Sequence, residues 1–326
     1  MPDRILIIKL GALGDVINTL PLAVALKQEL GCSIDWLVAP LSFPLVAGHP
    51  CVDRAICFNK KKGLDSVLDA ARQIRETRYD VTLDLQRILK SGLFAMAART
   101  RRRLGFDRAR CKEMSWIFPF ERIPPSDPHA HMLTQYLEFG AALGAFPKNV
   151  DWQIQGTSDP FPGLPESYAV LNIGATKPAN QWKPEYFAAL AGEVFQTLDL
   201  VPVLTGGRED MVKAVRIMDM AGTRIFDLTG RTTLPQLVHV IGNASCVVSC
   251  DTGPMHLASA LGIPLVALFG PSNPSRTGPY SGRVVKNPLS CSPCNRKHCI
   301  EPRCMETILP GDVLDALLDE LKTPSR

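Results

Sequence analysis

With 326 residues, the chain is long enough for two domains that each have a core of their own. Hydrophobic residues make up 46% of it, charged residues 21% and aromatic residues 7%, which excludes a disordered or fibrous protein. The formal net charge of +4 is small and locally concentrated, so the composition does not indicate a nucleic-acid-binding protein.

The chain contains no long apolar run. None reaches the roughly 18–20 apolar residues that a helix needs to span a bilayer. The first apolar run covers only residues 5–8, which is too short for the core of a signal peptide. These observations predict a cytoplasmic protein, and in that reducing compartment we expect the ten cysteines to be mostly thiols.

Apolar runs alternate with amphipathic segments through the first half of the chain. This alternation is typical of a parallel sheet whose two faces are both covered by helices. In chain order, the pattern predicts a strand at 5–10, a helix at 15–30, strands at 34–38 and 81–85 separated by a helix at 64–76, and helices at 89–98 and 135–143.

Prolines interrupt the pattern between residues 119 and 165, and we expect the linker between two domains at about 150–166. The alternation then resumes, with a strand at 168–173, a helix at 184–197, a strand at 201–204 and a helix at 210–221, and it continues through 225–228, 234–241, 246–249, 255–261 and 265–269 to a helix at 310–321. The predicted fold is α/β, with two doubly wound domains at 1–155 and 156–310, a cleft between them, and a terminal helix within 311–326.

The most informative segment is the polar turn Asp251-Thr252-Gly253, which follows the apolar run 246–249 and opens a short helix. The first turn of a helix presents backbone N–H groups and a positive partial charge, so it binds anions well. At the carboxyl end of a parallel strand, this turn predicts a site for a phosphorylated ligand. A single helical histidine is more often structural, but His256 lies beside the turn and is expected to contact the ligand.

Three further turns follow predicted strands. Asp15 comes after Gly11 and Gly14 and either caps the helix or serves the site; the turn lacks the third glycine of a dinucleotide fingerprint, which disfavours a nicotinamide cofactor. Lys177 and Lys183 either reach a phosphate or remain solvated. After Gly206-Gly207, Glu209 or Asp210 either accepts hydrogen bonds from a ribose or caps a helix.

Six arginines lie within residues 99–110, among them Arg101, Arg102 and Arg103. Guanidinium groups pair well with phosphate and carboxylate, so this run predicts either a site for an anionic acceptor or a solvated edge. Nucleic acid is disfavoured because Phe106 is the only aromatic residue within the run.

Four cysteines lie near the C-terminus, at Cys291, Cys294, Cys299 and Cys304. Their spacing is not one of the standard zinc patterns, so buried thiols or a redox-labile pair are favoured over a metal site.

Several motifs occur in the order seen in one enzyme family: Leu13-Gly14-Asp15-Val16, Gly174-Ala175 with Trp182 and Glu185, Gly206-Gly207, Asp251-Thr252-Gly253-Pro254-Met255-His256-Leu257-Ala258, Phe269-Gly270-Pro271-Ser272 and the cysteine-rich tail. On these motifs the chain resembles the family 9 glycosyltransferases, the ADP-heptose:lipopolysaccharide heptosyltransferases, over nearly its whole length.

The resemblance implies a GT-B fold of two Rossmann-like domains, with acceptor bound by the first, nucleotide sugar by the second, and the terminal helix packed back toward the first. It implies that Asp15 is the general base of an inverting transfer of heptose from ADP-heptose to the inner core of lipopolysaccharide. The expected acceptor-binding residues are Gly14, Arg101, Arg102 and Arg103. The expected donor-binding residues are Lys177, Lys183, Glu209, Asp251, Thr252, Gly253 and His256. No metal or other cofactor is implied, and the lipid acceptor implies peripheral contact with the inner face of the inner membrane.

Asn180 departs from the family pattern, which usually has a lysine at this position. Either Lys177 or Lys183 takes its place, or diphosphate binding differs. The alternatives are a family member with another nucleotide-sugar donor, the same fold used for epimerisation or hydrolysis of a nucleotide sugar, and a non-catalytic nucleotide-sugar-binding protein.

Overall fold

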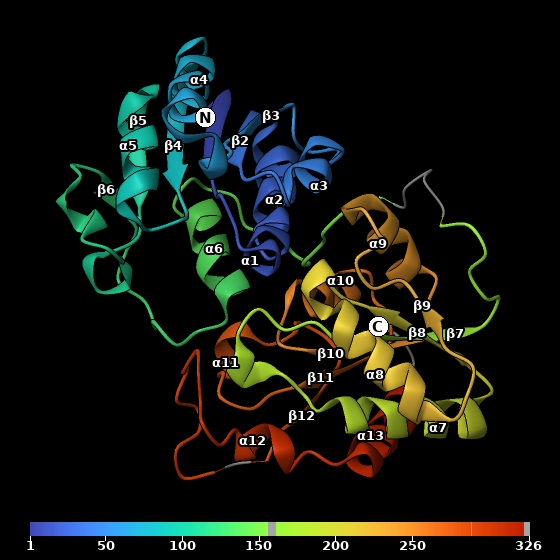
Figure 1. The fold of residues 1–326 in the computed structure, drawn as a ribbon. Coiled ribbons are helices and arrows are strands. Elements are labelled where there is room, and N and C mark those ends of the chain that lie inside the picture. The colour runs from blue at the N-terminus through green and yellow to red at the C-terminus, as the bar shows by residue number, and fades with distance from the viewer. Residues whose placement is uncertain (156–160, 288, 323–326) are drawn as a thin grey trace. The chain divides into compact units, whose positions relative to one another are not determined.

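The computed structural model describes residues 1–155, 161–287 and 289–322. The chain divides into two compact units, Met1–Gln155 and Gly156–Arg326, and each is built on a six-stranded sheet with helices (Figure 1). Every described strand pair is parallel. The predicted α/β class is therefore confirmed.

The first sheet has the strand order β3-β2-β1-β4-β5-β6. Its strands are β1 (Arg4–Ile8), β2 (Ser33–Val38), β3 (Arg54–Cys57), β4 (Arg78–Asp84), β5 (Arg99–Gly105) and β6 (Glu121–Arg122). The central strand β1 is apolar and buried at every position from Ile5 to Ile8, because helices cover both faces of the sheet. The strands β3, β5 and β6 were not predicted, since they lie toward the edges of the sheet and carry charged residues.

The helices of the first unit are α1 (Leu13–Ile17), α2 (Leu20–Leu30), α3 (Phe43–Ala47), α4 (Gly63–Arg75), α5 (Leu89–Ala97) and α6 (Met132–Ala141), with 3₁₀ turns η1 (Lys60–Lys62), η2 (Arg108–Arg110) and η3 (Ser115–Ile117). The single helix predicted at 15–30 is two helices, which corrects that prediction. The break has a local cause: Pro21 has no N–H, and its ring conflicts with the carbonyl of Ile17 in a continuous helix.

The second sheet has the order β12-β11-β10-β7-β8-β9. Its strands are β7 (Tyr168–Asn172), β8 (Val201–Thr205), β9 (Phe226–Asp227), β10 (Cys246–Cys250), β11 (Leu265–Leu268) and β12 (Arg283–Val285). The remaining elements are α7 (Pro184–Leu198), α8 (Met211–Ala221), α9 (Leu234–Gly242), α10 (Gly253–Ala260), α11 (Pro274–Thr277), α12 (Arg303–Glu306), α13 (Pro310–Lys322), η4 (Pro178–Asn180) and η5 (Arg208–Asp210).

The terminal helix α13 packs within the second unit, against α7 and the β10–β12 side of the sheet. It contributes Val313, Ala316 and Leu317 to the core of that unit. Its expected placement toward the first unit stays a prediction. Residues 323–326 of the predicted terminal segment and residues 156–160 of the predicted linker lie outside the described residues.

The strand order reverses once in each sheet. In the first sheet, β2 and β3 lie to one side of β1 while β4 lies to the other; in the second, β8 and β9 lie to one side of β7 while β10 lies to the other. Open parallel sheets bind ligands at the carboxyl ends of the strands where such a reversal occurs. The fold therefore directs attention to the segments that follow β1 and β4, and to those that follow β7 and β10.

Candidate functional site

Asp15 lies in α1, directly beyond the carboxyl end of β1. Its Oδ2 accepts a hydrogen bond from Lys9 Nζ at 3.2 Å, and its Oδ1 accepts one from the Tyr136 hydroxyl at 3.0 Å. The Asp15 side chain is 35% exposed, whereas the side chain of Lys9 is 2% exposed. Each carboxylate oxygen of Asp15 thus accepts a hydrogen bond from one buried donor, and part of the side chain remains accessible to solvent.

Lys9 is the first residue after β1, and nothing in the sequence pattern singled it out. Its ammonium lies 5.0 Å from the centroid of the Tyr136 ring, and its carbonyl accepts a hydrogen bond from Trp36 Nε1. A buried ammonium is costly unless a carboxylate pairs with it. A lysine at the end of an otherwise apolar central strand is therefore a signal that a partner carboxylate lies close by.

Opposing effects set the protonation of this pair. Burial raises the pKa of Asp15, but the Lys9 charge and the hydrogen bonds from Lys9 and Tyr136 outweigh burial, so the pKa lies below its ordinary value. Burial lowers the pKa of Lys9, and Asp15 opposes that shift. Asp15 is consequently an ionised carboxylate near neutral pH, which is the form that accepts a proton.

The carboxyl end of β4 supports the same loop. Gln86 Oε1 accepts hydrogen bonds from the backbone N–H groups of Leu10 and Gly11, at 3.0 and 3.3 Å. Next to it, the buried guanidinium of Arg87 lies 4.8 Å from the centroid of the Phe106 ring. Its Nε has no hydrogen-bond partner among the described residues. A buried, incompletely paired cation beside Asp15 is suited to an anionic ligand.

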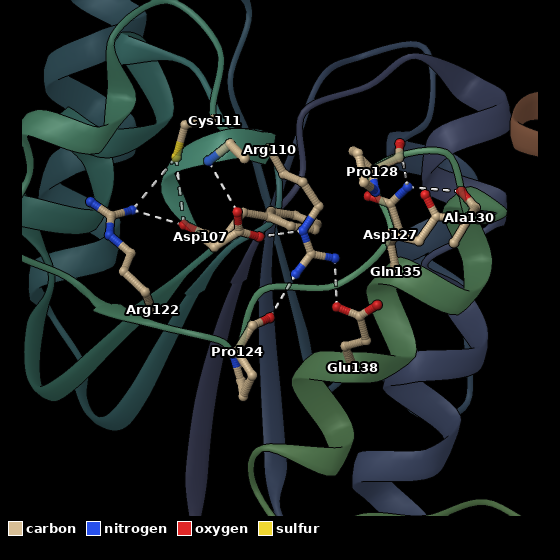
Figure 2. Close-up of polar contacts among 12 residues, drawn as sticks. Asp107, Arg110, Cys111, Arg122, Pro124, Asp127, Pro128, Ala130, Gln135 and Glu138 are labelled. Carbon is tan, nitrogen blue, oxygen red and sulfur yellow. Dashed lines mark hydrogen bonds and ion pairs between the residues drawn. The ribbon is translucent and has the colours of Figure 1, made fainter.

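Arg110 holds the loop after β5 to helix α6 (Figure 2). Its Nε donates to Asp107, its Nη1 to Glu138 on α6, and its Nη2 to the carbonyl of Pro124. Because α6 also carries Tyr136, this network fixes the helix that presents the phenol to Asp15.

Two further side chains in the same view hold neighbouring segments (Figure 2). Gln135 Nε2 donates to the carbonyls of Pro128 and Ala130, at 3.3 and 2.8 Å. Arg122 Nη1 donates to the carbonyl of Phe106. Gln135 therefore ties the segment before α6 to that helix, and Arg122 ties β6 to the residue that follows β5.

Of the residues expected to bind acceptor, Gly14 is buried in α1 beside Asp15, whereas the arginine run is not brought there. Arg102 pairs with Val81, which also pairs with Ile5, so this part of β5 lies toward the amino end of the sheet, opposite Asp15.

The three arginine side chains have other partners. Arg102 makes two-pronged contact with Glu121, Arg103 donates to the carbonyls of Ala95 and Ala98, and Arg101 is 85% exposed beside Asp80. The local sequence could not reveal these positions, because residues 99–105 form strand β5 and only the carboxyl end of that strand lies at the edge of the sheet that carries Asp15.

In the second unit, the predicted turn opens α10. Thr252 is the N-cap residue, and its own side chain makes no capping hydrogen bond to the helix. Asn172, at the end of β7, donates to Thr252 Oγ1 and to Ser249 Oγ, both at 3.0 Å. The two strands on either side of the order reversal thus jointly fix the turn, and the first turn of α10 presents backbone N–H groups as an anion site requires.

Asn180, the position that departs from the family pattern, is part of this framework. Its side-chain amide is buried and donates to Asp251 Oδ2 at 3.2 Å and to Ser272 Oγ at 3.3 Å. It therefore positions the acidic residue of the turn. Lys177 lies three residues earlier, as the half-buried N-cap residue of η4.

The other predicted donor residues have different surroundings. Lys183 is paired with Glu306 at 3.0 Å, and the Glu306 hydrogen bond raises the pKa of Lys183. Glu209 is exposed in η5, while His256 is buried in the first turn of α10.

Lys213 was not predicted. It is half-buried, it donates to the carbonyl of Ile173 at 3.0 Å, and loss of solvation lowers its pKa. It places a second cation behind the turns that follow β7 and β8.

Two glycines allow these turns to approach one another. A Cβ atom on Gly174 would lie 2.8 Å from Asp210 Oδ2, and one on Gly206 would lie 3.0 Å from the same oxygen. Asp210 is itself engaged, since Oδ2 accepts the backbone N–H of Gly207. Of the two acidic residues considered for a ribose, the exposed Glu209 is thus the better placed.

The four tail cysteines are all free thiols. Burial raises the pKa of Cys304, and the charges of Cys294, Cys291 and Cys299 add to this shift. Within residues 1–155, 161–287 and 289–322, no group of three or more His, Cys, Asp or Glu side chains is arranged to hold a metal ion.

Comparison with known proteins gives a consistent result. The family model for "Glycosyltransferase family 9 (heptosyltransferase)" matches residues 67–305. The chain is similar to lipopolysaccharide heptosyltransferase 1 of Pseudomonas aeruginosa, with 30% identity over 91% of this chain and 87% of the relative.

Solved structures agree over nearly the whole length. The structure of E. coli heptosyltransferase WaaC with ADP superposes with a TM-score of 0.81 at 22% identity, covering 97% of this chain and 99% of that one. E. coli ADP-heptose lps heptosyltransferase II gives a TM-score of 0.78 at 25% identity, covering 98% of each chain. These similarities confirm the predicted pair of Rossmann-like units of the GT-B class.

Proposed function

Because the chain belongs to glycosyltransferase family 9 (heptosyltransferase), we propose that it transfers heptose from ADP-heptose to the inner core of lipopolysaccharide with inversion at the anomeric carbon. The observation that carries this proposal is the ionised, one-side-accessible carboxylate of Asp15, held by Lys9 and Tyr136 at the strand-order reversal of the first sheet. The names of the relatives, lipopolysaccharide heptosyltransferases, support the sugar and the acceptor.

The chemical step needs one base. Asp15 accepts the proton of an acceptor hydroxyl while the oxygen of that hydroxyl forms a bond to the anomeric carbon of the donor. The bond from that carbon to the diphosphate breaks on the opposite face, and the nucleoside diphosphate leaves with the bonding electrons. Attack and departure on opposite faces give inversion.

The leaving diphosphate gathers negative charge, and the second unit supplies groups to meet it. The backbone of Thr252 and Gly253 at the start of α10 provides N–H donors and the positive end of the helix dipole, with His256 in the same turn. Lys177 is preferred over Lys183 as the lysine that contacts the diphosphate, because Lys183 is already paired with Glu306. Glu209 is proposed for the nucleoside.

We propose that basic residues at the carboxyl edge of the first sheet, and not Arg101, Arg102 and Arg103, bind the anionic acceptor. Residues that follow β3, β4 and β5 lie at the same edge of the sheet as Asp15, and several of them are exposed and basic: Lys60, Lys61, Lys62, Lys90, Arg108 and Lys112. The charge of Lys112 also acts on Lys9, which supports its closeness to the site. A cluster of this kind suits phosphate and carboxylate groups.

Exchange of Lys9 for methionine is expected to shift the pH dependence of transfer. Transfer requires ionised Asp15, and Lys9 lowers the pKa of that carboxylate. In Lys9→Met the pKa of Asp15 rises. The acidic limb of the activity profile therefore moves to higher pH, by roughly 1–3 pH units. The measurement is kcat/KM against pH. Lys27→Met, which removes a surface lysine paired with Asp53, serves as control and should not move the profile; a Lys9→Met profile that matches wild type would contradict the assignment.

Calorimetric titration with ADP, UDP and GDP, without added metal, tests the donor. We expect binding of ADP with a micromolar dissociation constant, on the order of −8 kcal/mol, and clear preference over UDP and GDP. Preference for UDP or GDP would move the donor to another nucleotide sugar within the family. Binding of ADP without turnover on any acceptor would support a non-catalytic nucleotide-sugar-binding protein, and turnover of the donor alone would support epimerisation or hydrolysis.

A further inference from the structure

Helices α4 and α5 each carry a second apolar face that points away from the sheet. On α4, the side chains of Ser66, Ala70 and Ile74 face the core, yet Leu64 and Leu68 are exposed one turn apart. Leu68 is 66% exposed. Because residues four apart share a face of a helix, the exposed leucines form a stripe and do not belong to the core.

The same arrangement occurs on α5. Phe94 and Ala95 face the core, while Leu89, Leu93 and Met96 are exposed at helical spacing. Leu93 is 64% exposed. Since α4 and α5 pack against one another on the same side of the sheet, their two stripes lie side by side.

The apolar surface continues beyond α5 into η3. The ring of Phe118 lies directly on Gly92 of α5, where an added Cβ would come within 2.0 Å of it. The preceding residues Trp116 and Ile117 are exposed. We refer to this surface as the α4–α5 face, formed by Leu64, Leu68, Leu89, Leu93, Met96, Trp116 and Ile117. Apolar groups gathered in this way on a folded protein mark an interaction surface.

The charge around this face indicates its partner. Residues 60–122 contain sixteen Lys and Arg against eight Asp and Glu, a net charge of +8, whereas the whole chain carries +4. A groove beside Leu68 is lined by three arginines and one carboxylate, with Arg72, Arg75 and Arg99 against Glu76. The exposed basic residues on α4, α5 and the segments next to them are Lys60, Lys61, Lys62, Arg72, Arg75, Lys90, Arg99, Arg108 and Lys112, and they outnumber the exposed acidic residues Asp65, Asp69, Glu76 and Glu113.

Helix α8 of the second unit provides a contrast. It also exposes apolar side chains, including Val212 and Val215, but the charges beside them balance, with Arg208 and Arg216 against Glu209 and Asp219. Of these two faces, the α4–α5 face combines exposed apolar side chains with a surplus of positive charge. This combination is complementary to an anionic lipid surface, where apolar side chains enter the interface and cations meet the headgroups.

We propose that the α4–α5 face docks the protein on an anionic lipid bilayer. No helix among the described residues has the length and apolar character to cross a membrane, so the contact is peripheral. Both helices begin at the carboxyl edge of the sheet, next to Lys62 and Lys90, which is the edge that carries Asp15. Docking there would bring an acceptor hydroxyl of a membrane-anchored lipid toward the carboxylate; this last step rests on the proposed function.

Cosedimentation of the full chain with vesicles tests the docking without any assay of transfer. We expect binding to phosphatidylcholine vesicles that contain phosphatidylglycerol, weaker binding at high salt, and little binding to phosphatidylcholine alone. The double variant Leu68→Gln, Leu93→Gln should lower partitioning at least about tenfold, since it removes two apolar side chains from the interface. Val212→Gln, Val215→Gln on α8 is the matched control and should bind as wild type.

Several outcomes would overturn the proposal. They are absence of wild-type binding to anionic vesicles, undiminished binding by Leu68→Gln, Leu93→Gln, and loss of binding in the α8 control. Self-association of the wild type that disappears in Leu68→Gln, Leu93→Gln would show that a second copy covers the face. The thermal midpoint of each variant should match wild type, because all four positions are exposed.

Turnover then separates docking from function. With a deacylated, water-soluble acceptor, Leu68→Gln, Leu93→Gln should retain wild-type activity, and with a vesicle-borne acceptor it should lose about the same factor as in partitioning. Equal activity of variant and wild type on the vesicle-borne acceptor would overturn the link to catalysis. Wild-type binding to vesicles without turnover of either acceptor would overturn the proposed function and leave docking in place.

Discussion

Replacement of Asp15 by asparagine is expected to lower the rate of transfer by about 10²–10⁴-fold, the usual contribution of a general base. The amide keeps the size of the side chain but cannot accept the acceptor proton. The groups that hold the turn at Asp251 and Thr252 belong to the second unit, so the affinity for ADP should remain unchanged. Single-turnover transfer and calorimetry on the same preparation measure the two quantities.

Asp80→Asn is a suitable control for this variant. Asp80 belongs to the same sheet but lies near the start of β4, where it accepts hydrogen bonds from the backbone of Asp3 and Arg4. Its exchange should leave transfer unaffected. Undiminished turnover in Asp15→Asn would remove the central argument for catalysis at this site, and a parallel loss of ADP binding would show that the effect is not confined to proton transfer.

Replacement of Arg110 by methionine is expected to destabilise the first unit by about 3–5 kcal/mol, as is typical when one member of a buried ion pair is removed. The side chain of Arg110 is 1% exposed, and it lies between the carboxylates of Asp107 and Glu138. Methionine leaves both carboxylates without their cation. Denaturant titration, with a probe that reports on the first unit, measures the change in the free energy of unfolding.

Two comparisons sharpen this experiment. Arg108 lies two residues before Arg110, and its exposed guanidinium lies over the Trp116 ring. Arg108→Met should change the free energy of unfolding by no more than about 0.5 kcal/mol. The triple variant Asp107→Asn, Glu138→Gln, Arg110→Met also removes the two carboxylates that Arg110→Met leaves unpaired. It should recover part of the lost free energy of unfolding. An Arg110→Met variant that unfolds at the wild-type denaturant concentration would contradict the network drawn in Figure 2.

The alternation of apolar runs predicted the class of fold, because central strands buried on both faces leave a strong signal. It failed for the edge strands β3, β6 and β12 and for β5 next to an edge, where the strands are short or carry charge. β5 shows the reason most clearly: its arginines extend to partners such as Glu121 and the carbonyls of Ala95 and Ala98, none of which a local pattern can reveal.

The candidate site divides in a similar way. Asp15 and the turn at Thr252 could be predicted, because short segments after a strand carry their own signal. Tyr136 could not, since it reaches Asp15 from 121 residues away. The role of Asn180 was also hidden, because a missing lysine gives no indication that the amide holds Asp251 and Ser272.

The division of contacts between the two units bears on how acceptor and donor preferences diverge during evolution. The hydrogen bonds described for Asp15 come from Lys9 and Tyr136 in the first unit, and those described for Thr252 and Asp251 come from Asn172 and Asn180 in the second. Each of these two groups of residues is held by hydrogen bonds within its own unit. On the proposal that residues 1–155 bind the acceptor and the second unit binds the nucleotide, substitutions in residues 1–155 are expected to change which hydroxyl is glycosylated without disturbing recognition of the nucleotide, so selection can alter the two specificities separately.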